Sequence, residues 1–203
     1  MLIWYLARGA GISAFAMLSL ATAAGALTSR RSGGVDRRLI LQYVHRSAAL
    51  TGLTLLALHI GTLLADRYAH VGATGALFPL ASGYRPVAVS FGVLAMYLLV
   101  VAALTGLLRS RFARSDAAGR RWRSIHLAGY AAWVSAAWHF YTVGTDAGQW
   151  WARLTLLAGI GAVALGLLGR LVGPAAIDPG PAAPLGVPER PRHREPARAG
   201  GLR

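Results

Sequence analysis

The chain has 203 residues, of which 55% are hydrophobic, and it carries a formal net charge of +14. Its basic side chains are all arginine, 21 in number, set against seven acidic residues and no cysteine. The lack of cysteine excludes disulfides, thiol catalysis, iron–sulfur clusters and covalent heme attachment through C-x-x-C-H. In a soluble protein this charge would suggest a nucleic-acid partner. Here the arginines lie between and after long apolar stretches, which instead indicates membrane topology.

Five apolar stretches of the sequence, each of roughly twenty residues or more, are long enough to cross the ~30 Å hydrocarbon layer of a bilayer as helices. We therefore expect an all-α integral membrane protein, with a five-helix transmembrane bundle formed by residues 1–172. Residues 173–203 are rich in Pro, Gly, Ala and Arg, and this composition predicts a disordered tail. The expected spans cover about residues 2–28, 39–65, 87–108, 124–143 and 152–172.

The arginines also indicate the direction of each span. They cluster at residues 30–38 and 109–123, whereas the loop at 66–86 holds only two. Because basic loops stay in the cytoplasm, we expect the N-terminus outside and the tail in the cytoplasm. The spans at 39–65 and 124–143 then run parallel, both toward the outside. The protein is expected to be a multi-pass protein of the cell membrane, in contact with lipid.

These two parallel spans carry the candidate functional residues, two histidines each. His45 and His59 are 14 residues apart and His126 and His139 are 13 apart, so each pair is separated by about 20 Å along its helix. Ionisable residues inside a membrane are rare and usually functional. Parallel helices bring His45 level with His126 near the cytoplasm, and His59 level with His139 near the outside.

Each level is suited to hold one heme iron between two imidazoles, which fills both axial positions and favours electron transfer over oxygen binding. The expected cofactors are two b-type hemes, with the four histidines as iron ligands. A 13-residue spacing leaves His126 and His139 about 140° apart on an ideal helix. Helix tilt, a local bulge or hemes approached from different sides would each absorb this difference. Arg46, beside His45, would either neutralise a heme propionate or extend to the lipid headgroups.

Histidine pairs spaced by 14 and 13 residues, with one helix between them, resemble the ferric reductase-like transmembrane family. These diheme cytochromes include the membrane parts of NADPH oxidases and ferric-chelate reductases. The resemblance covers residues 2–172. It implies that His45 and His126 bind the inner heme, that His59 and His139 bind the outer one, and that electrons cross the membrane singly. Further supporting stretches are LHIGTLLAD at 58–66, YRPVAVSFGVLAMYLL at 84–99 and WRSIHLAGYAAW at 122–133.

The chain departs from that family in two respects. Oxidase and reductase members carry a cytoplasmic domain that binds flavin and NADPH, but no strand–G-x-G-x-x-G–helix unit follows the last span here. A separate flavoprotein, another redox partner or a quinol is therefore expected to supply electrons. Many members have six helices where five are expected here, which leaves a place for a helix from a partner.

The sequence thus predicts an electron-transfer membrane subunit, an oxidoreductase component without its own flavin or NAD(P)H domain. No catalytic residue is assigned, and no nucleic-acid partner is expected. Two other hypotheses stay open. A non-redox membrane anchor or small transporter would use the histidines for polar packing or as a proton relay. A heme transport or sensing protein would bind heme weakly and keep an axial position open.

Overall fold

The computed structural model describes residues 2–28, 35–66, 68–112 and 115–172, and every regular element within these ranges is a helix. This confirms the all-helical fold for the described residues. The predicted tail at 173–203 lies outside them. Four helices are long and apolar enough to cross a membrane, which agrees with four of the five expected spans. They are α1 (Leu2–Thr28), α2 (Val35–Ala65), α4 (Pro86–Leu107) and α8 (Trp150–Val172).

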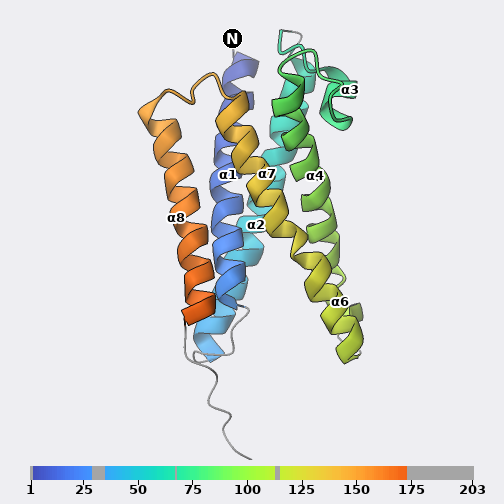
Figure 1. Cartoon of the computed structure of the whole chain (residues 1–203), viewed down its shortest axis with the longest axis vertical. Coiled ribbons are helices and arrows are strands. Elements are labelled where there is room, and N and C mark those ends of the chain that lie inside the picture. The colour runs from blue at the N-terminus through green and yellow to red at the C-terminus, as the bar shows by residue number, and fades with distance from the viewer. Residues whose placement is uncertain (1, 29–34, 67, 113–114, 173–203) are drawn as a thin grey trace, which may run out of the picture.

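The expected span at 124–143 is not one helix. It is divided between α6 (Asp116–His126) and α7 (Ala128–Val143), and α7 alone has 16 residues. Leu127, between the two, keeps helical backbone angles (φ −61°, ψ −16°), so that α7 continues from α6 after a bend (Figure 1). The bend directly follows His126. A local break of this kind is one way for a 13-residue spacing to bring two side chains to one side of the chain.

Helix α1 lies at the centre of the bundle, packed along α2 and α8. Half of its most apolar stretch is buried, against 11% for α2. Glycines on the neighbouring helices allow this close approach: a Cβ added to Gly52 would lie 2.8 Å from Leu18, and one added to Gly166 would lie 2.8 Å from the carbonyl oxygen of Ala23. Small residues at helix contacts are typical of packing inside membranes.

Helices α4 and α7 form a second packed group. It contacts the first group, formed by α1, α2 and α8, where α7 lies against α1. At this contact Phe15 stacks on Phe140 with ring centroids 4.9 Å apart, and the Trp133 Nε1–H donates to Ser19 Oγ over 2.8 Å. In contrast, no Cα of α2 lies within 8 Å of a Cα of α4, α6 or α7 among the described residues. Since packed helix axes are about 8–10 Å apart, α2 faces these helices across a wider space.

Two short helices lie at opposite ends of the bundle. Helix α3 (Gly72–Leu77) belongs to the loop between α2 and α4, at the upper end in Figure 1 together with the N-terminus and the α7–α8 turn. Helix α5 (Arg109–Phe112) precedes α6, whose start marks the lower end. We call these the upper end and the lower end of the bundle.

Candidate functional site

The lower histidine pair consists of His45 on α2 and His126 at the end of α6. Their ring centroids lie 6.3 Å apart, and their planes are inclined by 72°. The structure therefore brings together two side chains that are 81 positions apart in the sequence, on helices that do not pack against each other. The pairing agrees with the one expected from helix direction and spacing; the role of these residues as iron ligands stays a prediction.

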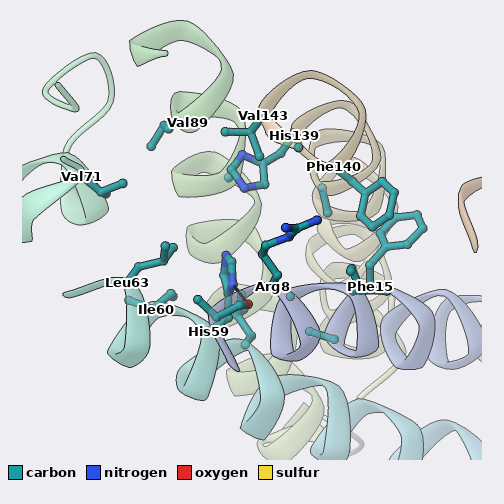
Figure 2. Close-up of a pocket in the computed structure, with 18 of the residues that line it drawn as sticks. Arg8, Phe15, His59, Ile60, Leu63, Val71, Val89, His139, Phe140 and Val143 are labelled. Carbon is teal, nitrogen blue, oxygen red and sulfur yellow. Dashed lines mark hydrogen bonds between the residues drawn. The ribbon is translucent and has the colours of Figure 1, made fainter. Parts of the chain in front are cut away.

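The upper histidine pair consists of His59 on α2 and His139 on α7. Both line one cavity of about 370 Å³, and Figure 2 shows their rings entering it from opposite sides. Most of the lining is apolar, contributed by α1, α2, α4 and α7. Arg8 and Asp146 also line this cavity, as its charged side chains.

The histidine rings are oriented through Nδ1, which in three of them faces a backbone carbonyl oxygen of the neighbouring helix. A carbonyl oxygen only accepts hydrogen bonds, so Nδ1 carries a proton in these three rings. In the neutral form of each ring, Nε2 is then the nitrogen that keeps its lone pair and can bind a ligand. The Nδ1–oxygen distances are 2.7 Å for His45 and Ala21, 2.7 Å for His59 and Ala7, and 2.9 Å for His139 and Ala88.

His126 Nδ1 faces a side chain in place of a backbone carbonyl. Its Nδ1 lies 3.1 Å from Thr105 Oγ1, and the Thr105 hydroxyl donates to the Ala102 carbonyl over 2.9 Å. The hydroxyl oxygen is therefore free to accept the Nδ1 proton. Trp122 stacks on the His126 ring at 5.0 Å and 15°, and its Nε1–H donates to the Thr105 carbonyl over 2.8 Å. Both groups fix the ring at the bend between α6 and α7.

A glycine lies beside each of the four rings. For His45, His59 and His139 it is on the helix whose carbonyl faces Nδ1, and for His126 it is on the helix that carries Thr105. Gly11 and Gly25 lie on α1, and Gly92 and Gly106 lie on α4. A real Cβ essentially never comes within 3.0 Å of another heavy atom, so three of these positions have no room for alanine while the ring stays in place. The closest approaches of an added Cβ are 2.8 Å at Gly11 to His59, 2.9 Å at Gly25 to His45, 2.7 Å at Gly92 to His139 and 3.7 Å at Gly106 to His126.

These glycines repeat at the spacing of the histidines. Both glycine pairs are 14 residues apart, as are His45 and His59. Each accepting carbonyl stands four residues before its glycine, as Ala7 does before Gly11 and Ala88 before Gly92. The helix pairs α1–α2 and α4–α7 therefore present their histidines in the same way, with α6 replacing α7 at the lower level.

The one remaining predicted site residue, Arg46, has less distinct surroundings. Arg46 is exposed on α2, so that its contact with a propionate stays a prediction. The glycines, Thr105 and Arg8 are not among the residues that the sequence singles out. The 14-residue spacing of the glycines and the arginine inside the first apolar stretch are both visible in the sequence.

Residues 2–146 match the profile of a family described as a domain of unknown function, DUF8596. The chain belongs to the DUF8596 family. The matched region contains the four histidines, the four glycines beside them, Arg8 and Asp146, and it ends before α8. No curated protein and no solved structure was found to match the chain. The DUF8596 description itself assigns no activity to the site.

Proposed function

We propose that this DUF8596 protein is a diheme b-type cytochrome, an electron-transfer subunit of the cell membrane similar to the membrane part of ferric reductase-like proteins. The observation that carries the proposal is the distance between His45 and His126. A metal–imidazole bond of about 2 Å on each side, plus about 1.2 Å from each nitrogen to its ring centre, requires centroids about 6.4 Å apart. The observed 6.3 Å fits two imidazoles that share one metal ion.

The number of donors favours a macrocyclic cofactor over a bare ion. Within the described ranges, no group of three or more His, Cys, Asp or Glu side chains is arranged to hold a metal ion. Each histidine pair supplies two nitrogens, whereas structural metal sites in proteins commonly use four protein ligands. A heme iron needs only two axial ligands from the protein.

The hydrogen bonds of the rings support the same function. Metal-binding histidines usually donate their second ring N–H to a carbonyl or another acceptor, which fixes the ring and raises its basicity. Nδ1 of His45, His59 and His139 has a backbone acceptor of this kind, and Nδ1 of His126 has the Thr105 hydroxyl. Four Nε2 atoms are thereby available as ligands.

The space between the helices suits a flat, mostly apolar group. Helix α2 is not packed against α4, α6 or α7, and at the upper level the cavity between the histidines is bounded mainly by hydrocarbon. The glycines on α1 and α4 have no side chain that would displace the imidazoles. Phe15 and Phe140, stacked at the contact between α1 and α7, help to keep water out of the bundle.

Two iron porphyrins at levels about 21 Å apart along α2 would supply reversible one-electron chemistry across the bilayer. The protein's own groups hold and orient the ligands at both levels. In the proposed orientation the arginine-rich lower end faces the cytoplasm and the upper end faces outside. The end of α6 and α7 together make the fifth crossing. A separate flavoprotein, another redox partner or a quinol supplies the electrons.

The proposal is tested by the heme content of the purified protein. The chain is expressed with an adequate heme supply, purified in detergent and analysed by pyridine hemochrome assay and a redox-titrated optical spectrum. We expect two b hemes per chain with two reversible one-electron steps. One heme per chain, or none, would contradict the diheme assignment, and spectra showing an open axial position would favour heme transport or sensing.

A further inference from the structure

Arg8 is a charged residue inside the apolar helix α1. It directly follows Ala7, whose carbonyl oxygen accepts the hydrogen bond of His59. Charged residues inside membrane helices are costly and commonly mark a functional site. The Arg8 side chain is only 26% exposed, and Figure 2 shows it in the cavity between His59 and His139.

Among the residues that the structure describes, Asp146 and Trp4 contact the Arg8 guanidinium. Asp146, in the turn between α7 and α8, forms an ion pair with it, and the guanidinium carbon lies 3.9 Å from the centre of the Trp4 ring. A guanidinium has five N–H donors arranged in a planar fork. Trp4 contacts its face, and one carboxylate engages at most two or three of these donors. Arg8 therefore has the capacity to bind a second carboxylate, on the side that faces the cavity.

We propose that Arg8 binds a carboxylate of the ligand in the upper cavity, and that Asp146 competes with the ligand for it. The inference rests on the proposed function, in which the ligand is an iron porphyrin that carries two propionates. Arginine matches a carboxylate through two parallel hydrogen bonds, a geometry that lysine does not reproduce. Asp146 holds the guanidinium in position until the propionate takes over part or all of its donors.

The alternative role for the ion pair is a structural tether between α1 and the α7–α8 turn. The two roles predict different effects of the two partners. A tether is broken equally by removing either residue. A ligand-binding Arg8 is lost in Arg8→Gln, whereas Asp146→Asn removes a competitor and leaves Arg8 available.

The experiment measures ligand affinity at the upper level in the full chain. His45→Ala serves as the background, because it removes the lower level. The probes are iron protoporphyrin IX and its dimethyl ester, which has the same macrocycle without the propionate charges. Arg153→Gln is the matched control, since Arg153 lies near the same turn and its Nε–H donates to the Ala147 carbonyl over 3.2 Å.

We expect Arg8→Gln to weaken binding of iron protoporphyrin IX about ten- to a hundredfold, as the loss of a charge-assisted hydrogen bond requires. The dimethyl ester should bind Arg8→Gln and the parent equally. Arg8→Lys should show an intermediate loss, Asp146→Asn should bind at least as tightly as the parent, and Arg153→Gln should be unchanged.

Three outcomes overturn the inference. They are unchanged heme affinity in Arg8→Gln, equal weakening of heme and its dimethyl ester, and equal weakening by Arg8→Gln and Asp146→Asn. A parent protein that binds no heme overturns the proposed function and this inference with it. Heme binding by the parent together with any of the three outcomes overturns the inference alone.

Discussion

His45 and His126 lie on helices that do not pack against each other, and yet their ring centroids are 6.3 Å apart. The two rings are held by hydrogen bonds to different helices. His45 donates to the Ala21 carbonyl on α1, and His126 donates to Thr105 on α4. The two imidazoles therefore approach each other from two packed groups of helices, and a shared metal ion would connect these groups at the lower level, in addition to the contact between α1 and α7.

Each single histidine replacement should remove one heme, and replacing either of the two histidines of a pair should remove the same heme. His59→Ala and His139→Ala should both lose the upper heme, and His45→Ala and His126→Ala should both lose the lower one. The other heme should largely remain, because the levels are about 21 Å apart along α2. Redox-titrated spectra of the four variants provide the measurement. If His59→Ala and His126→Ala lost the same spectral component, the assignment of the pairs would be wrong.

The glycines beside the rings should differ in their tolerance of alanine. An added Cβ would lie 2.7 Å from His139 at Gly92 but 3.7 Å from His126 at Gly106. We expect Gly92→Ala to displace the imidazole and cost about 1–3 kcal/mol, the usual penalty of overpacking. Gly11→Ala and Gly25→Ala should behave in the same way.

Gly106→Ala is the control for this series, since 3.7 Å is an ordinary contact and alanine favours the helix. Thermal unfolding in detergent and heme content at each level give the two measurements. The explanation fails if Gly106→Ala is as damaging as Gly92→Ala, or if Gly92→Ala retains full heme content and stability.

The pairing of the histidines can be predicted from the sequence because a helix converts spacing into depth and basic loops indicate direction. The bend at Leu127 cannot be predicted in this way. It occurs where His126 contacts Thr105 and Trp122, and the contact with Thr105 forms only when α4 packs against α6. The expected fourth span accordingly appears as two helices.

The groups that orient the rings are harder to foresee. Ala7 and Ala21 act through backbone oxygens, and a carbonyl has no sequence signature. The glycines have one, a spacing of 14 residues, but the chain contains 25 glycines. Only the structure distinguishes those beside a histidine, such as Gly11, from those with open space around them, such as Gly61.

Replacing Thr105 should affect the lower heme and not the upper one, because Thr105 contacts His126. Thr105→Val keeps the shape of the side chain and removes the oxygen that accepts from His126 Nδ1. Loss of this hydrogen bond should cost about 0.5–1.5 kcal/mol and make the His126 ring less well oriented and less basic. We expect weaker retention of the lower heme and a shift of its midpoint potential, with the upper heme unchanged. Thr105→Ser, which keeps the hydroxyl, should restore both properties; equal effects of Val and Ser would show that packing alone is responsible.

The orientation in the membrane can be measured directly because the chain has no cysteine of its own. Single cysteines are placed at Ala73 in α3, at Ala117 in α6 and at Thr145 in the α7–α8 turn, all exposed positions. With the arginine-rich lower end in the cytoplasm, a membrane-impermeant maleimide applied to intact cells should label the cysteines at 73 and 145. The cysteine at 117 should react only after lysis, and the cysteine-free parent should stay unlabelled. Labelling of position 117 alone would reverse the orientation. Equal behaviour of positions 117 and 145 would mean that α6 and α7 do not carry the chain across the bilayer, and the parallel arrangement of the histidine-bearing segments would have to be abandoned.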